Sequence, residues 1–240
     1  MCKFFSFVTD GNRKKYYFDW EARVELLKNN PQDLRPDSHT SICAKFGLSD
    51  DRVNKYEFNP LTNEFTVDQI NIKDDRKSAQ KWVKKLDFKT IITPLVIKPI
   101  VNPFKIEPPV INNKHIDLLK SWASARDSAR DSARDSVWDS VWDSVWDSVR
   151  DSVGFSIWAS VRDSVGFSTW DSVGVSTWDS VGAYVSSFFL LENWKYTNCP
   201  PYVNPFQSCI DLWEQGIIPS YDGKKWRLHT KNGIAWEGII

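Results

Sequence analysis

Residue types that build catalytic and metal centres are scarce in this chain. Three histidines and four cysteines are spread over 240 residues, and no two cysteines form a CxxC pair. Zinc sites and disulfide frameworks need such residues at close spacing, so we predict neither. The chain also has no P-loop, no GxGxxG dinucleotide motif and no GxSxG nucleophile elbow. No cofactor and no metal are therefore expected.

Net charge and long apolar runs are lacking as well. Lysine plus arginine equal aspartate plus glutamate at 31 each, so the overall charge favours neither nucleic acid nor an anionic membrane as partner. No stretch approaches the roughly eighteen apolar residues of a membrane helix. The start, MCKFFSFVTDGNRKK, has no signal-peptide core. We expect a soluble, cytoplasmic protein with reduced cysteines.

The chain is nevertheless rich in core-forming residues. Apolar residues make up 41% and aromatic residues 14%, with thirteen tryptophans, which is typical of a folded protein. Residues 1–112 are predicted to form an α+β domain that ends in a proline-rich connector at 90–111. Hairpins are expected around Asp10–Asn12 and Asn59–Asn63, and helices over WEARVELLKNN and DDRKSAQKWVKKLDF, the second capped by Asp74 or Asp75.

A strict four-residue repeat fills residues 113–185. Serine recurs at every fourth position from Ser124 to Ser180, fifteen times without a slip, mostly followed by valine or alanine. In an α-helix this period drifts about 40° per repeat, so no single face of a long helix stays buried. Valine-tryptophan sides with aspartate-serine corners, about twelve residues per coil, predict a short β-solenoid instead. Helices or a helical hairpin are the alternative, and a flexible linker is a third.

Residues 186–240 are predicted to cap the repeat. AYVSSFFLLENWKY is bulky and apolar, and a helix is expected over Ser208–Gln215. Residues Ser220–Gly223 are expected to turn into the strand KKWRLH, which pairs with IAWEGII. The third region is therefore a small helix-plus-hairpin module.

Several segments carry a resemblance to known sequences. They are MCKFFSFVTDG, PDSHTSI at 36–42, NKYEFNPLTNEFTVDQI at 54–70, the tandem DSVW and DSVR units, and FQSCIDLWEQGIIPSYDGKKWRLH at 206–229. Over nearly its whole length the chain resembles a family of bacterial, phage and metagenomic proteins with no assigned activity. The resemblance implies two fixed ends around a repeat tract of variable length. It also implies a host-cytoplasmic or virion-associated location if the protein is phage-encoded.

Two weak catalytic candidates lie in the first domain. Cys2 would become an N-terminal nucleophile if Met1 were removed, although its neighbours fit a buried strand residue equally well. His39 lies in the polar motif PDSHTSI, whose residue types suit a general base or a phosphate or ribose contact. Its neighbours Asp37, Ser38 and Thr40 are the accompanying binding candidates, and a turn followed by a capped element is the simpler interpretation.

The repeat offers aromatic and cationic candidates. Arg126, Arg130 and Arg134 alternate with aspartates, which cancels the field that a phosphate backbone needs, so a salt-bridged, solvent-facing wall is the simpler interpretation. Trp138, Trp142 and Trp146 follow in consecutive repeats and predict an apolar contact surface. We therefore favour a non-catalytic binding or structural protein that forms a dimer through this wall and takes a protein or small-ligand partner. An enzyme or nucleotide-binding protein, with its site around His39 or Cys2, is the alternative.

Overall fold

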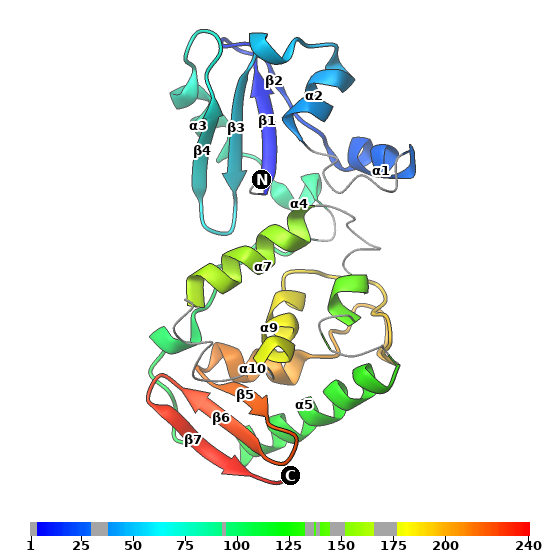
Figure 1. The fold of residues 1–240 in the computed structure, drawn as a ribbon, viewed down its shortest axis with the longest axis vertical. Coiled ribbons are helices and arrows are strands. Elements are labelled where there is room, and N and C mark those ends of the chain that lie inside the picture. Colours follow the sequence, from blue (N-terminus) through cyan, green and yellow to red (C-terminus); the bar gives the residue numbers. More distant parts are fainter. Residues whose placement is uncertain are drawn as a thin grey trace. The chain divides into compact units, whose positions relative to one another are not determined.

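The computed structural model describes residues 4–29, 38–92, 95–132, 137, 140–144, 152–165 and 177–240. The chain divides into an N-terminal unit, Met1–Pro99 with Val149–Ile157, and a C-terminal unit, Ile100–Ser148 with Trp158–Ile240. Each unit combines helices with an antiparallel sheet (Figure 1), so the predicted α+β class is confirmed.

The N-terminal unit is built on a four-stranded antiparallel sheet. Its strands are β1 (Phe5–Thr9), β2 (Lys15–Tyr16), β3 (Asn54–Asn59) and β4 (Glu64–Gln69), in the order β2-β1-β3-β4. Phe7 lies opposite Tyr56, and Phe58 lies opposite Phe65. Both predicted hairpins are confirmed, and their turns contain residues with positive φ, Gly11 at 70° and Asn63 at 57°.

Helices cover both faces of this sheet. They are α1 (Trp20–Asn29), α2 (His39–Phe46), α3 (Arg76–Val83) and α4 (Phe88–Ile91), with a 3-10 turn at Asp50–Arg52. Every residue of β1 and β3 is buried. On one face Phe7 packs on Trp82 of α3 and Phe5 on Phe88 of α4, with ring centroids 4.9 and 5.1 Å apart. On the other, Val8 joins a cluster with Ile42 of α2. The predicted helices at α1 and α3 are confirmed.

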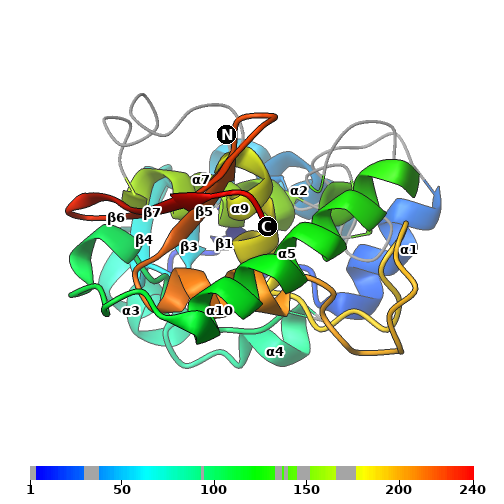
Figure 2. The same ribbon diagram turned by 90° about the horizontal axis from the view of Figure 1, so that it is seen from below.

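The C-terminal unit packs helices against a three-stranded sheet. Its elements are a 3-10 turn (Pro103–Lys105), α5 (Asn113–Ser132), α9 (Thr177–Ser186), α10 (Gln207–Glu214), β5 (Ile218–Tyr221), β6 (Trp226–Thr230) and β7 (Gly233–Gly238). The sheet order is β5-β6-β7, and α10 runs beside α5 (Figure 2). Tyr184 of α9 stacks on Trp213 of α10 with centroids 4.8 Å apart. The predicted C-terminal helix and hairpin are confirmed, but Ser220 and Tyr221 belong to a strand rather than to a turn.

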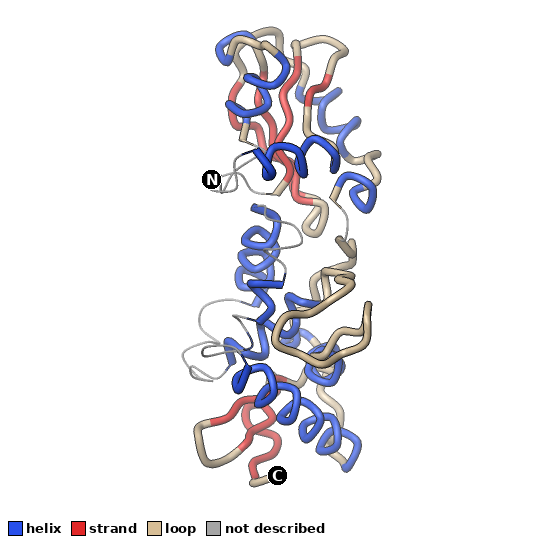
Figure 3. Tube along the Cα trace, turned by 90° about the vertical axis from the view of Figure 1, so that its right-hand side faces the viewer, coloured by secondary structure: helices blue, strands red, loops and turns tan. Residues whose placement is uncertain are grey.

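The repeat is helical wherever the structure describes it. Besides α5 and α9 it contains α7 (Ser152–Val165), and Figure 3 draws these segments as helices. The described residues of 113–185 include no strand, so the β-solenoid prediction is wrong for them and the helical alternative holds. The reason is length: α7 has 14 residues, over which a period of four drifts only about 140°. Short helices therefore avoid the loss of a buried face that a single long helix would suffer.

Serine residues of the repeat also pack inside the C-terminal unit. Ser140, Ser144 and Ser180 are 2% exposed or less. The hydroxyl of Ser144 donates to the carbonyl of Ser140 at 2.6 Å, and that of Ser180 donates to Pro219 at 2.7 Å. A small side chain whose hydroxyl is hydrogen-bonded can face the core. The serine position of the repeat can therefore pack inside, as the valine or alanine position can.

Arg126 differs from the prediction of a solvent-facing arginine. Its side chain is 7% exposed, and its Nε donates to Asp179 of α9 at 2.7 Å. The guanidinium lies 5.5 Å from the ring centroid of Tyr221 and 5.6 Å from that of Trp226. The arginine is salt-bridged as predicted, but it lies in the interior. There its charge is compensated by Asp179, which is 53 residues away along the chain, and its guanidinium lies near two aromatic rings.

None of the helices in the described part of the chain has a stretch long and apolar enough to cross a membrane.

Candidate functional site

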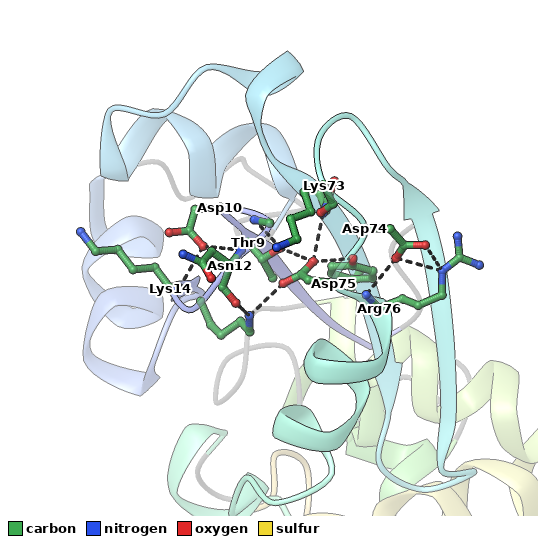
Figure 4. A network of polar contacts seen from close by, with 12 residues as sticks. Thr9, Asp10, Asn12, Lys14, Lys73, Asp74, Asp75 and Arg76 are labelled. Atoms are coloured by element: carbon green, nitrogen blue, oxygen red, sulfur yellow. Dashed lines mark hydrogen bonds and ion pairs between the residues drawn. The ribbon is translucent and has the colours of Figure 1, made fainter.

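A pocket with charged lining residues lies in the N-terminal unit, where the β1–β2 turn meets the start of α3. It has a volume of about 410 Å³, and its wall consists of Gly11, Asn12, Lys73, Asp74, Asp75, Arg76, Lys77 and Ser78. Figure 4 shows the polar network from which this wall is built. The pocket is within the size range of small-molecule sites.

The β1–β2 turn forms one side of the pocket and is held in a fixed conformation. One carboxylate oxygen of Asp10 accepts hydrogen bonds from the backbone N–H groups of Asn12 at 3.0 Å and Lys14 at 3.1 Å. Gly11 has a φ of 70°, and a Cβ atom at this position would lie 2.8 Å from the carbonyl oxygen of Lys73. The turn can therefore pack directly on the opposite wall because the residue is glycine.

Asp75 belongs to the wall and accepts hydrogen bonds from four side chains (Figure 4). Its Oδ1 accepts from Tyr56 Oη at 2.7 Å, Thr9 Oγ1 at 2.8 Å and Asn54 Nδ2 at 3.0 Å, and its Oδ2 from Lys15 Nζ at 2.9 Å. Burial alone would raise the pKa of Asp75, but the hydrogen bonds from these four residues together hold it below its ordinary value. The charge of Asp75 is thus fully compensated inside the protein.

The second aspartate of the wall is also compensated. Asp74 accepts hydrogen bonds from the backbone N–H and the Nε of Arg76, both at 3.0 Å. The hydrogen bond from the Arg76 side chain is the main reason that the pKa of Asp74 is lowered. Asp74 therefore caps the first turn of α3, while Asp75, at the N-cap position, turns its carboxylate inward.

Two cations of the wall have no acidic partner in the part of the chain that the structure describes. Lys73 and Lys77 are exposed, and neither ammonium group takes part in a described ion pair or hydrogen bond. The backbone carbonyl of Lys73 is fixed by a 2.8 Å hydrogen bond from Asn54 Nδ2. The wall thus combines two satisfied carboxylates with two available ammonium groups, an arrangement suited to an anion.

His39 does not belong to this pocket. It is the first residue of α2 and is buried, with Nε2 3.0 Å from the carbonyl oxygen of Tyr56 and Nδ1 3.2 Å from a carboxylate oxygen of Asp68. Ser38 is the N-cap of α2, since its hydroxyl accepts from the backbone N–H of Ser41 at 3.1 Å. Thr40 is exposed on the helix. This is the predicted turn and capped element.

The remaining sequence candidates are only partly described. Trp142 is half-buried in a helical segment of the repeat. Cys2, Asp37, Trp138 and Trp146 lie outside the described residues.

In the sequence, Asp74 and Asp75 are recognisable only as candidate helix caps, and the pocket is not recognisable. The signal that was present is the coincidence of a DGN turn with KDDRKS, a segment in which cations flank two aspartates. The two segments lie together because strands that are distant in the sequence pair with one another. Neither segment by itself predicts that pairing.

Comparison with protein-family models, with characterised proteins and with solved structures finds no match.

Proposed function

We propose that this chain is a non-catalytic binding protein whose N-terminal unit holds a phosphate-bearing anion in the pocket between the β1–β2 turn and α3. One observation carries the proposal: Lys73 and Lys77 lie on a wall whose two carboxylates are already neutralised by Lys15 and Arg76. An anion entering the pocket therefore meets uncompensated positive charge.

The backbone at the start of α3 adds to this preference. The first N–H groups of a helix have no partner within the helix and point toward its N-terminal end. The N–H of Arg76 is used by Asp74, whereas those of Lys77 and Ser78 have no acceptor among the described residues. Two backbone donors thus accompany the two ammonium groups at the pocket.

Binding rather than catalysis is favoured by the state of the catalytic candidates. Both ring nitrogens of His39 already face oxygen atoms, and its side chain is only 9% exposed. A general base needs a nitrogen within reach of substrate. The enzyme alternative would then rest on Cys2 alone.

The experiment is a calorimetric titration with inorganic pyrophosphate. We expect the wild type to bind and Lys73→Gln/Lys77→Gln to bind at least roughly tenfold more weakly, because two charged hydrogen bonds are lost. Lys105→Gln/Lys114→Gln, which removes two exposed lysines of the C-terminal unit, is the matched control and should bind as the wild type does. A wild type that does not bind pyrophosphate, or a pocket variant with unchanged affinity, would overturn the proposal.

A further inference from the structure

Helix α3 and the turn that follows it carry exposed lysines beyond the pocket. Lys77 and Lys81 of α3, with Lys84 and Lys85 just after its end, are all exposed, and we call them the α3 lysine row. On the other side of the helix Ala79 and Val83 are fully buried, and Trp82 packs on Phe7 and Tyr17. The apolar side is thus fixed against the sheet, and the cationic side is left facing solvent.

The charge of the row is not balanced nearby. From Lys73 to Lys89 the chain has seven lysines and arginines against three aspartates. Asp74 pairs with Arg76, Asp75 is buried with Lys15, and Asp87 caps α4 by accepting from the N–H of Lys89. Among the described residues no ion pair includes a lysine of the row.

The spacing of the row brings like charges together. Lys77 and Lys81 are four residues apart on α3 and so lie on one side of the helix, and Lys84 and Lys85 follow directly after its last residue, Val83. A pair of like charges at this spacing destabilises a helix unless an anion screens it. Lys81 lies about 6 Å beyond Lys77 along the helix axis at 1.5 Å per residue, and Lys84 and Lys85 continue past it, outside the lining of the pocket. An anion that covers the row must therefore carry several charges in sequence.

We propose that the α3 lysine row binds the phosphate backbone of a nucleic acid duplex, with one phosphate held between Lys73 and Lys77. This inference rests on the proposed function, because the same pocket receives that phosphate. Lysines at regular spacing contact phosphates without reading bases. The zero net charge of the whole chain does not prevent such a contact, since the contact depends on the local field of α3.

The exposed and buried residues of α3 favour a duplex over two other polyanions, a single-stranded nucleic acid and an anionic membrane surface. Single strands are usually bound by exposed aromatic rings on which bases stack, but the exposed residues of α3 are lysine, arginine, serine and glutamine. Membrane-surface helices insert their apolar side between lipid headgroups, but that side of α3 is already packed on the sheet. The duplex backbone needs neither feature.

The test measures fluorescence anisotropy of a labelled DNA duplex of about 20 base pairs at several salt concentrations. We expect the wild type to bind with an affinity that falls steeply with salt. Lys81→Gln/Lys84→Gln/Lys85→Gln should bind DNA at least roughly tenfold more weakly, with the salt slope reduced by about 3. The same variant should bind pyrophosphate as the wild type does, because Lys73 and Lys77 are intact. Lys105→Gln/Lys114→Gln should retain both activities.

The outcomes separate the two proposals. Pyrophosphate binding without DNA binding overturns the duplex and leaves the pocket in place, whereas loss of both overturns both. DNA binding that the row variant leaves unchanged also overturns the duplex proposal. Row-dependent binding to vesicles of phosphatidylcholine with phosphatidylserine, in the absence of DNA binding, would assign the row to a membrane surface instead.

Discussion

Among single residues, Asp75 connects several strands of the N-terminal sheet through one carboxylate, which accepts four side-chain hydrogen bonds. Its donors come from β1, β2 and β3, and its own position is the N-cap of α3. Lys15, whose side chain is 7% exposed, would be left as a buried charge without this carboxylate. The residue therefore links the wall of the pocket to the sheet, and loss of its charge is expected to destabilise the unit.

The lowered pKa of Asp75 allows a prediction of how the free energy of unfolding depends on pH. The pKa of Asp75 is lower in the folded state than its ordinary value of about 3.9. The contribution of the Asp75 carboxylate to the free energy of unfolding is therefore fully present above that value. It is lost as the pH falls through the lower folded-state pKa. We expect Asp75→Asn to lower the free energy of unfolding at pH 7 by about 3 kcal/mol. Urea unfolding between pH 7 and pH 3 should show the difference between wild type and variant shrinking as the pH drops below about 4.

Asp74→Asn is the control for this measurement, because Asp74 is exposed and pairs only with the adjacent Arg76. A similar loss of stability in both variants would show that burial of Asp75 is not the cause.

Gly11 is the second decisive residue, and it can be tested against another glycine. Gly11 and Gly47 both have positive φ, 70° and 63°, but a Cβ at Gly11 meets the Lys73 carbonyl whereas nothing lies within 4 Å of one at Gly47. We expect Gly47→Ala to cost about 1 kcal/mol from backbone strain and Gly11→Ala to cost at least about 2 kcal/mol. Gly11→Ala should also weaken pyrophosphate binding, because the turn must move from the wall. Equal destabilisation would contradict the close approach.

At the scale of elements, the repeat helices α5 and α9 are joined by one buried ion pair. Asp179 accepts from Arg126 Nε at 2.7 Å and from the backbone N–H of Val137 at 3.2 Å. The rings of Tyr221 and Trp226 complete the surroundings of Arg126. The arginine of one repeat thus forms an ion pair with the aspartate of another repeat that is distant in the sequence. This pairing explains how a polar repeat contributes to a core.

Asp179→Asn is expected to destabilise the C-terminal unit by about 3 kcal/mol, because Arg126 would stay buried without its counter-charge. Urea unfolding followed by tryptophan fluorescence measures the change. Glu25→Gln, which breaks the exposed pair between Glu25 and Lys45, should have little effect. A small effect at Asp179 would mean that Arg126 can reach solvent when its partner is removed.

At the scale of the whole molecule, self-association through the repeat is still a prediction. Trp138, Trp142 and Trp146 recur at a spacing of four; Trp142 is half-buried in a helical segment, and the other two lie outside the described residues. Large rings gathered on a surface favour a contact with a second copy. We expect a dimer in light scattering, and a monomer when all three are changed to serine.

Trp178→Ser is the matched control for that variant, since Trp178 is a repeat tryptophan that is 41% exposed in α9. It should leave the dimer intact. A monomeric wild type, or a triple variant that still associates, would exclude this surface as the interface.

Local signals in the sequence determined much of the secondary structure. Alternating apolar residues around Asp10–Asn12 and Asn59–Asn63 predicted two hairpins, and helical spacing of Ala79, Trp82 and Val83 predicted α3. These predictions hold because turns, caps and periodicity act between residues that are close along the chain. The C-terminal helix and the pairing of β6 with β7 were predicted for the same reason.

Tertiary structure alone decided the conformation of the repeat and the position of the pocket. A period of four fits a helix or a solenoid, and whether Ser180 is buried depends on Pro219, which is 39 residues away. Whether Asp75 caps a helix or forms a buried network depends on Thr9 and Lys15, which are 66 and 60 residues away. Burial and charge compensation are properties of partners brought together by the folded chain, so they were decided by packing rather than by local pattern.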